Sequence, residues 1–167
     1  MSFQVRILCH LSILVLYFHI GQVNSKGICL YFSLKIASWF DALIECQKHH
    51  MCLADLNTEV TLVQMETKFN HEDHEYWFGL NSHEKKNYRY VSNNKSIEYS
   101  PIHSKLVNDG LCAFVKHEYG FYKFESADCN IHKRFICTRA DECDGLQLKP
   151  VKSKCFISEK QKQVVAY

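Results

Sequence analysis

Cysteines constrain this chain more than any other feature of its sequence. Nine occur among 167 residues, and Cys9 lies in an N-terminal segment that we expect to be removed, which leaves an even number. An even number of cysteines in an exported chain predicts a framework of disulfide bonds. A zinc site is the alternative, but zinc-binding Cys-x-x-Cys pairs are absent from the sequence. The remaining cysteines are Cys29, Cys46, Cys52, Cys112, Cys129, Cys137, Cys143 and Cys155.

Residues 1–25 have the composition of a secretory signal peptide. Arg6 is their only charge, a largely apolar run extends from Ile7 to Ile20, and Val23 and Ser25 suit the positions before a cleavage site. A membrane anchor is the alternative, but the apolar run is shorter than the roughly 20 residues that a spanning helix needs. The sequence therefore predicts cleavage after Ser25, secretion, and a mature chain that does not insert into a membrane.

The rest of the chain divides into one domain at 26–139 and a tail at 140–167. The domain begins with two helical patterns and continues with short apolar and aromatic runs, an order that predicts an α+β fold. The tail is polar and rich in lysine, and it contains Pro150. We expect this tail to be irregular and to be tethered by Cys143 and Cys155.

Capping residues and apolar spacing predict two helices. Ser38 and Asp41 have the spacing of a capping box, and Asn57 or Thr58 begins the second helix with Glu59 in its first turn. The inner face of the first helix is expected to contain Trp39, Ala42, Leu43 and Cys46. The weaker second pattern gives an inner face of Val60, Val63 and Phe69. Strands are expected at 27–36, 53–56, 76–80, 87–91, 96–100, 111–116, 121–124 and 134–138.

Several of these motifs together resemble the C-type lectin-like domain family over about residues 27–139. Trp-x-x-Ala-x-x-x-Cys at 39–46 is similar to the first helix of that family, and Trp-Phe-Gly-Leu at 77–80 is similar to its Trp-Ile-Gly-Leu motif. The departures from the family pattern resemble those of insect secreted single-domain members, including proteins of reproductive or immune secretions. The family's order of later cysteines is matched by Cys112, Cys129 and Cys137.

This resemblance implies a fold of two helices and two small antiparallel sheets with two disulfides. The implied bonds are Cys46–Cys137 and Cys112–Cys129. A chain-entropy model attributes roughly 4–5 kcal/mol to the first bond, which closes a loop of about 90 residues, and about 3 kcal/mol to the second. The residues expected in the structural core of the domain are Trp39, Trp77, Gly79, Leu80 and Phe124.

Four cysteines lie outside the family pattern, and they allow three pairings. Cys143–Cys155 is the local choice and leaves Cys29–Cys52, which is the arrangement that we expect. A bond from Cys29 on the first strand to Cys143 just after the last strand is the alternative.

The residues that hold calcium in sugar-binding members of the family are replaced in this chain. Such members use a Glu-Pro-Asn or Gln-Pro-Asp triplet in a long loop, and a Trp-Asn-Asp triplet before a conserved cysteine. Here Phe-Glu-Ser at 124–126 occupies the second place, and 100–111 contains neither loop triplet. Calcium prefers six to eight oxygen ligands, so we expect no calcium site of the family type and no other cofactor. The candidate ligand-binding residues are Asn108, Asp109, Glu118 and Glu125.

Charge and motifs argue against several other classes of function. The chain has 20 basic and 18 acidic residues, whereas nucleic-acid binding requires clustered basic residues. It has no Gly-x-Ser-x-Gly elbow or phosphate-binding glycine loop, and we expect no enzymatic activity. The segment 70–75 lacks the second histidine of a His-Glu-x-x-His zinc motif, so we interpret it as a polar connector. His49 and His50 are interpreted as the end of the first helix.

We therefore expect a secreted recognition module. Its partner is either a glycan, bound without calcium through aromatic stacking, or an extracellular protein bound by the same loops; a structural part of an assembly is a third interpretation. Asn94 lies in the only N-glycosylation sequon, Asn-Lys-Ser. The sequence leaves the oligomeric state open. The aromatic residues considered for stacking are Tyr88, Tyr90, Tyr99, Tyr119, Phe121 and Tyr122.

Overall fold

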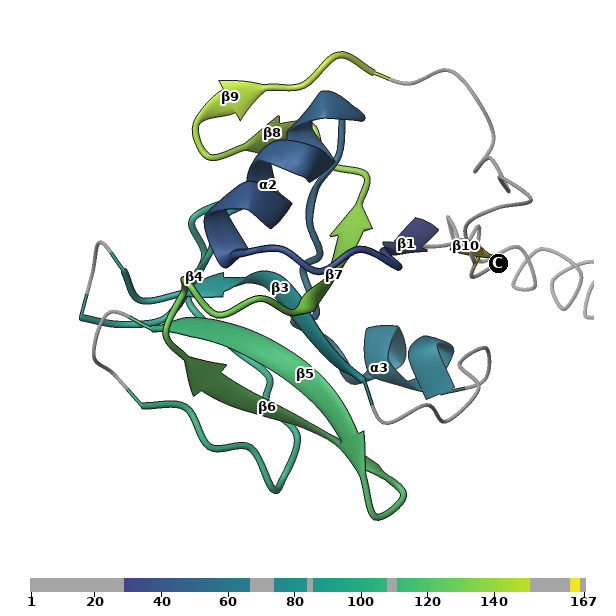
Figure 1. The fold of residues 1–167 in the computed structure, drawn as a ribbon, viewed down its shortest axis with the longest axis vertical. Coiled ribbons are helices and arrows are strands. Elements are labelled where there is room, and N and C mark those ends of the chain that lie inside the picture. The colour runs from purple at the N-terminus through teal and green to yellow at the C-terminus, as the bar shows by residue number, and fades with distance from the viewer. Residues whose placement is uncertain (1–28, 67–73, 84–85, 108–110, 151–162, 166–167) are drawn as a thin grey trace, which may run out of the picture.

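The computed structural model describes residues 29–66, 74–83, 86–107, 111–150 and 163–165. The predicted signal peptide at 1–25 lies outside the described residues. The described residues form two helices, α2 (Trp39–Lys48) and α3 (Glu59–Glu66), and ten strands (Figure 1). The strands are β1 (Cys29–Phe32), β2 (Cys52–Leu53), β3 (Glu75–Asn81), β4 (Arg89–Tyr90), β5 (Cys112–Glu118), β6 (Phe121–Ala127), β7 (Arg134–Thr138), β8 (Glu142–Cys143), β9 (Leu146–Gln147) and β10 (Gln163–Val165).

Eight strands belong to one sheet, in which β10, β1, β7, β3, β5 and β6 follow one another, while β2 pairs with β7 and β4 with β3. Paired strands are antiparallel except β3 and β7, which are parallel. β8 and β9 form a separate antiparallel hairpin. The predicted α+β class, with two helices and antiparallel pairing, is confirmed. α2 and the β8–β9 hairpin lie at one end of the molecule, and the β5–β6 hairpin lies at the other (Figure 1).

α2 begins and ends where the sequence predicts. The Ser38 hydroxyl accepts a hydrogen bond from the Asp41 N–H at 3.1 Å, so it satisfies a backbone donor that the first turn leaves without a partner. At the other end His50 has a positive φ of 56°, and its N–H donates to the Gln47 carbonyl. The buried face of the helix is formed by Trp39, Ala42, Leu43 and Cys46.

The predicted inner face of α3 is wrong. Thr58 caps this helix, since its hydroxyl accepts from the Thr61 N–H at 3.2 Å. Val60 and Val63 are exposed, while Leu62 and Met65 are buried, and Phe69 lies outside the described residues. Apolar residues occur all around this helix, so the spacing of the sequence does not single out one face.

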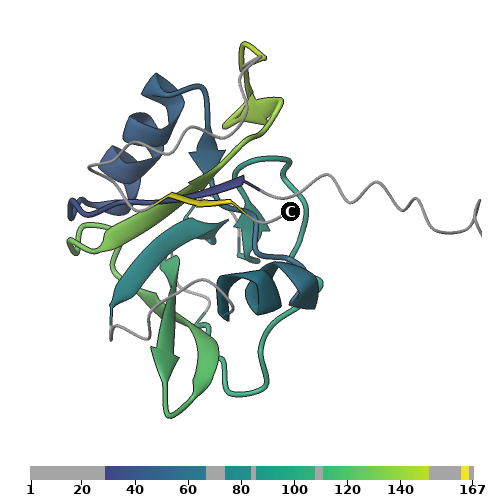
Figure 2. The same cartoon turned by 90° about the vertical axis from the view of Figure 1, so that its right-hand side faces the viewer.

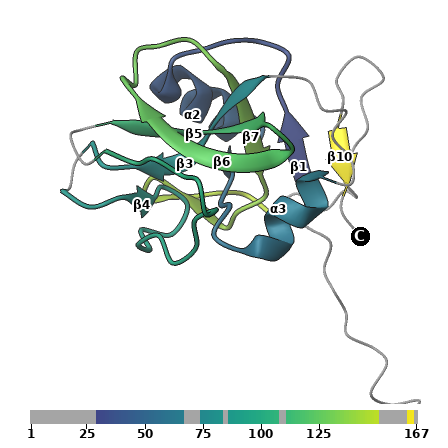
Figure 3. The same cartoon turned by 90° about the horizontal axis from the view of Figure 1, so that it is seen from below.

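The two helices cover opposite faces of the sheet, and β3 separates two cores. Because successive side chains of a strand point to opposite faces, Trp77 lies among the residues that pack on α2, whereas Tyr76 and Phe78 lie with the buried residues of α3. Figure 3 views the sheet with α2 and α3 on either side. The Trp77 ring N–H donates to the carbonyl oxygens of Ala37 and Ile131, at 3.1 and 3.2 Å. Trp77 therefore joins three segments of the chain.

Gly79 on β3 is required by close packing of two backbones. A Cβ at this position would lie 2.8 Å from the carbonyl oxygen of Leu53 and 3.1 Å from that of Ala54. The Gly79 N–H donates to the same Ala54 carbonyl at 2.9 Å. The segment after β2 can therefore approach the sheet only because this residue has no side chain.

The structure contains the two disulfides that the family resemblance implies, but it pairs the other cysteines differently. Cys46–Cys137 and Cys112–Cys129 are present, with sequence separations of 91 and 17. The third bond is Cys52–Cys143, which replaces both the expected Cys29–Cys52 and Cys143–Cys155 bonds and the alternative Cys29–Cys143 bond. Cys29 is also disulfide-bonded, to a cysteine outside the described residues. Cys155 lies outside the described residues as well.

The path of the chain after β7 explains the Cys52–Cys143 bond. β2 pairs with the end of β7, with Cys52 opposite Thr138. The chain then turns back beside α2, where the Cys143 carbonyl accepts a hydrogen bond from the Gln47 side chain at 3.4 Å. Cys143 is thereby buried next to Cys52.

Two further predictions about regular structure are wrong. The tail is not irregular throughout, since β8 and β9 form a hairpin through Asp144 and Gly145, both with positive φ, and β10 pairs with β1. The strand expected at 96–100 is reduced to a single bridge between Arg89 and Ser96. The backbone N–H groups of Glu98 and Tyr99 instead donate hydrogen bonds to the side-chain oxygen of Asn57.

Candidate functional site

The β5–β6 hairpin gathers two of the four candidate ligand-binding residues. Its two-residue turn consists of Tyr119 and Gly120, with φ of 52° and 84°, as the twist of a tight hairpin requires. In the resulting register Lys116 lies opposite Lys123. Side chains two residues apart share a face of a strand, so Glu118 and Glu125 lie on the same face as these lysines.

These four side chains form a charge cluster (Lys116, Glu118, Lys123 and Glu125). The Lys116 ammonium lies 3.1 Å from Glu125 and 3.8 Å from Glu118, and the Lys123 ammonium lies 3.2 Å from Glu125 and also pairs with Glu118. The hydrogen bond from Lys123 holds the pKa of Glu118 below its usual value. Burial alone would raise the pKa of Glu125, but hydrogen bonds from both lysines outweigh burial and lower it. The pKa of Lys123 is raised, first by its bond to Glu118.

The three residues at the place of the family's Trp-Asn-Asp triplet all have internal roles. Phe124 is buried in the core, and Glu125 belongs to the charge cluster. The Ser126 hydroxyl accepts a hydrogen bond from the Val107 N–H at 3.0 Å. The Lys105 N–H donates to the Phe124 carbonyl at 2.7 Å, and Lys105 forms a parallel bridge with Glu125. The loop at 105–107 therefore runs along the edge of β6.

The described side chains at this place do not fit a calcium ion. Each oxygen of Glu125 accepts from a lysine, and the Ser126 hydroxyl accepts from the loop backbone. A cation there would lie next to two ammonium groups, which repel it. Across the part of the chain that the structure describes, no three histidine, cysteine or acidic side chains are grouped to hold a metal ion. Asn108 and Asp109, the other two candidates, lie outside the described residues.

The structure separates the aromatic candidates into a buried group, an exposed pair and Tyr99, which is partly buried and packs against the core. Tyr88, Tyr90 and Tyr122 are buried, so they contribute to the core. Burial also raises the pKa of Tyr88, whose hydroxyl donates to the Val107 carbonyl at 2.8 Å. Tyr119 and Phe121 are 90% and 62% exposed at the end of the hairpin.

The end of the hairpin and the neighbouring loop form an exposed apolar surface. Ile102 is 95% exposed, and the adjacent His103 ring lies 6.0 Å from the Phe121 ring, in an edge-on arrangement. We call Ile102, His103, Tyr119 and Phe121 the hairpin-tip surface. The charge cluster borders it through Glu118 opposite Phe121. An exposed apolar surface with a charged border is typical of a binding surface.

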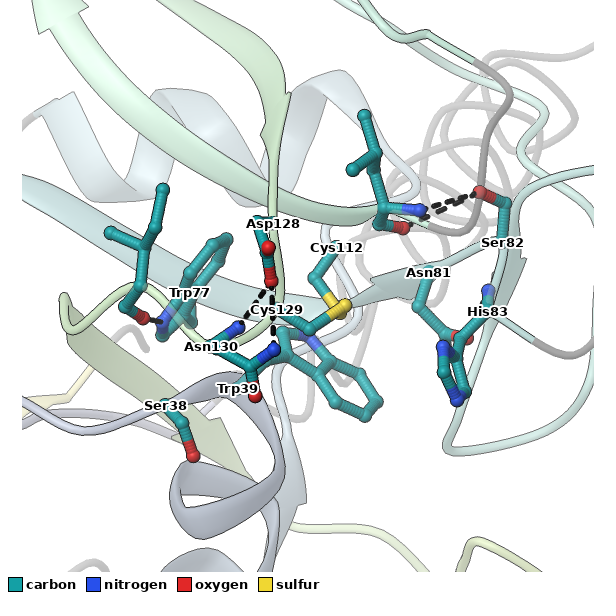
Figure 4. The surroundings of a disulfide bond; sticks show 12 residues. Ser38, Trp39, Trp77, Asn81, Ser82, His83, Cys112, Asp128, Cys129 and Asn130 are labelled. Atoms are coloured by element: carbon teal, nitrogen blue, oxygen red, sulfur yellow. Dashed lines mark hydrogen bonds between the residues drawn. A yellow bond between two sulfur atoms is a disulfide. The ribbon is translucent and has the colours of Figure 1, made fainter.

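A groove lies at the opposite end of the molecule, and sequence reasoning missed it. Its volume is about 290 Å³. We call it the Arg89 groove. Figure 4 shows three residues that line it, Trp39, Asn81 and His83, near the Cys112–Cys129 bond. The remaining lining residues are Phe40, Leu43, Arg89, Tyr90, Val91, Asn94, Glu142, Asp144 and Gly145.

Other charged and histidine-bearing segments have structural roles. Lys133 is nearly buried, with its ammonium 4.0 Å from the centre of the Phe114 ring, and it forms an ion pair with Glu75. The His74 ring lies edge-on to the Tyr76 ring, while residues 70–73 of the predicted polar connector lie outside the described residues.

Neither of the two described helices has the length and apolarity that crossing a membrane requires.

Comparison with known families identifies the class of the domain. The model of the C-type lectin domain family, Lectin C-type domain, matches residues 35–139. This match covers more than half of the chain, and the chain therefore belongs to the C-type lectin domain family. Domains of this family bind carbohydrates or proteins and are generally not enzymes. No curated protein matches the chain.

Solved structures share the fold at low sequence identity. The C-type lectin domain of murine dendritic cell inhibitory receptor 2, in complex with N-glycan, superposes with a TM-score of 0.59 at 13% identity, over 68% of this chain and 91% of that one. A Ca²⁺-dependent type II antifreeze protein in its Ca²⁺-free form gives 0.59 at 16%, over 69% and 94%. Human lithostathine gives 0.53 at 23%, over 69% and 93%. These likenesses show the fold.

Proposed function

We propose that the chain is a secreted recognition module that binds carbohydrate without a calcium ion. The observation that carries this proposal is the environment of Glu125 and Ser126, whose oxygens already accept hydrogen bonds from Lys116, Lys123 and the loop backbone. To bind calcium, these oxygens would have to give up their partners while two ammonium groups stayed nearby. We infer that no cofactor takes part in binding and that the chain has no catalytic role.

Secretion is supported by two independent features. Residues 1–25 have the pattern of a signal peptide. The described part of the chain also contains three disulfides between its own cysteines, and such bonds persist in oxidising compartments outside the cytosol. Kinship with insect secreted lectin-like proteins stays a prediction.

The hairpin-tip surface supplies the chemistry that sugar binding without a metal requires. A sugar ring has an apolar face that stacks on an aromatic side chain, and Tyr119 and Phe121 are both exposed. Its hydroxyl groups need donors and acceptors, which Lys123 and Glu118 provide beside these rings. The murine domain that shares this fold is known in complex with an N-glycan, which favours carbohydrate as the class of ligand.

Protein recognition is the second candidate, and one observation favours it. The most exposed apolar residue of the hairpin-tip surface is Ile102, an aliphatic side chain. Aliphatic side chains gain little from a sugar but become buried in an apolar protein interface. A protein ligand would therefore contact Ile102 as well as the two aromatic residues.

A glycan array, run with calcium and repeated with EDTA, tests the first candidate. We expect specific binding that survives EDTA and that is lost in the Tyr119→Ser/Phe121→Ser variant. The matched control is Ile44→Ser, which alters an exposed apolar residue on α2 at the other end of the molecule. Binding that disappears in EDTA would contradict calcium independence. Silence across the array would reject carbohydrate and leave protein recognition, which Ile102→Ser would then test.

A further inference from the structure

The one N-glycosylation sequon lies at the Arg89 groove. Asn94 is exposed in the turn after β4, where it has a positive φ of 56° and its N–H donates to the Tyr90 carbonyl. Its own carbonyl accepts from the Arg89 guanidinium at 2.8 Å. Asn94 is also one of the residues that line the groove. A sugar attached to its side chain would therefore begin at the wall of a preformed hollow.

The groove has an apolar wall on which a sugar ring can pack. Phe40 is 38% exposed on α2, and the His83 ring lies 5.1 Å from it in an edge-on arrangement. Leu43, one helical turn from Phe40, is also part of the lining. The ring face and the acetamide methyl of an N-acetylglucosamine residue are apolar, so they match this wall.

The rest of the lining offers both donors and acceptors. Arg89 carries five N–H donors, of which one donates to the Asn94 carbonyl. Glu142 and Asp144 supply carboxylate oxygens from the β8–β9 hairpin. A ligand rich in hydroxyl groups, with one amide carbonyl, suits such a mixed set better than a ligand of a single charge.

Size and tethering favour a small attached sugar over a free ligand. The volume of about 290 Å³ lies just below the range of about 300–1,000 Å³ that is usual for ligand pockets. A sugar joined to Asn94 faces the groove at the high effective concentration of an intramolecular ligand, so weak contacts suffice to hold it. A free glycan would have no such advantage and would have to compete with it.

We propose that Asn94 carries an N-linked glycan whose first N-acetylglucosamine residue lies in the Arg89 groove, between Phe40 and Arg89. This inference rests on the proposed secretion, because N-glycans are added to exported chains. The docked sugar would connect α2, the turn after β4 and the β8–β9 hairpin. It would also fill the groove, so external ligands would bind elsewhere on the molecule.

The test uses the full chain, produced in a eukaryotic secretory host. Mass spectrometry first establishes whether Asn94 is occupied. Melting temperatures are then compared for the glycosylated protein, for protein trimmed by an endoglycosidase to a single N-acetylglucosamine, and for Ser96→Ala, which keeps Asn94 but removes the sequon. We expect loss of the sugar to lower the melting temperature by about 2–4 °C, the shift that a contact of modest strength produces in a domain of this size. Trimming to one sugar residue should cause no change.

The groove is tested by repeating the comparison in altered backgrounds. In Phe40→Ala and in His83→Ala, removal of the sugar should no longer lower the melting temperature. In Ile44→Ala, which changes an exposed residue of α2 outside the groove, removal of the sugar should lower the melting temperature as before. An equal effect of the sugar in all backgrounds would overturn the docking while leaving secretion and glycosylation intact. An unoccupied Asn94 in secreted protein would overturn the inference alone, and a chain that is retained in the cell would overturn the proposed secretion with it.

Discussion

The two ends of the molecule are stabilised in different ways. At the α2 end, Cys46–Cys137 joins the first helix to β7, Cys52–Cys143 joins β2 to β8, and Trp77 is buried in the same core. At the other end, the hairpin extends beyond the Cys112–Cys129 bond, and the charge cluster lies between that bond and the turn. Figure 2 shows α2 (blue) and the hairpin (green) on opposite sides of β1 and β7. A covalently fixed end thus supports an end whose apolar side chains face solvent.

Removal of the two long-range disulfides should give the largest loss of stability. Cys46–Cys137 and Cys52–Cys143 each have a sequence separation of 91, so a loop of that size is freed only when all four cysteines are replaced by alanine, and for this variant the chain-entropy model gives at least about 4–5 kcal/mol. The Cys112→Ala/Cys129→Ala variant, with a separation of 17, should lose about 3 kcal/mol. Urea unfolding under non-reducing conditions measures both free energies. An equal or larger loss for the second variant would show that the α2 end does not dominate stability.

The two ends can also be compared by adding a side chain to a glycine in each of them. Gly79→Ala places a Cβ 2.8 Å from the Leu53 carbonyl oxygen, and overpacking of this kind typically costs about 1–3 kcal/mol. Gly120→Asn in the hairpin turn is the control, because nothing lies within 4 Å of a Cβ there and asparagine tolerates positive φ. We expect the control to lose clearly less free energy of unfolding. Similar losses would mean that the turn is as constrained as the core.

Local patterns of the sequence predict much of this fold. Ser38 and Asp41 alone locate the start of α2, and the aromatic run at 76–80 locates β3, because capping and alternation depend on residues a few positions apart. Features that depend on distant segments are missed. The Cys52–Cys143 bond follows from the path of the chain after β7, and the strand expected at 96–100 is prevented by the side chain of Asn57.

The candidate sites show the same limit. The sequence gives the acids Glu118 and Glu125 but not the lysines that neutralise them, since this pairing requires the hairpin register. The hairpin-tip surface combines a turn with a loop that lies about 16 residues earlier, and no spacing rule connects the two. The Arg89 groove is assembled from α2, the ends of β3 and β4, and the β8–β9 hairpin. No periodic signal in the chain points to such an arrangement.

Acid should weaken both ends of the molecule, and the hairpin more. The pKa values of Glu118 and Glu125 are held below the ordinary value of 4.5. A carboxyl whose pKa is lower in the folded state contributes stability above its unfolded pKa, and this contribution is lost as pH falls through the folded pKa. The free energy of unfolding should therefore fall below about pH 4.5, and less steeply in Glu118→Gln/Glu125→Gln.

Glu45 supplies the matched acid at the α2 end, where its hydrogen bond from Lys48 lowers its pKa. Glu45→Gln should remove a smaller part of the acid dependence, because it replaces one ion-paired carboxylate, whereas the charge cluster contains two. Urea titrations at pH values between about 3 and 7 measure the slopes. If Glu45→Gln reduces the pH dependence of the free energy of unfolding as much as the double variant does, the charge cluster contributes no more to acid sensitivity than Glu45.

Replacement of the exposed aromatic residues should have the smallest effect on stability. Tyr119 and Phe121 are largely exposed, so Tyr119→Ser/Phe121→Ser removes little buried area, and surface substitutions usually change the free energy of unfolding by no more than about 0.5 kcal/mol. Tyr122→Ser is the contrast, because the neighbouring Tyr122 ring is buried and its loss should resemble a core truncation, about 3 kcal/mol or more. Unfolding curves of both variants test the distinction. A large loss for the exposed pair would mean that these rings stabilise the hairpin, and their exposure would then be no argument for binding. A negligible loss, together with loss of ligand binding, would separate the residues that hold the fold together from those that face a partner.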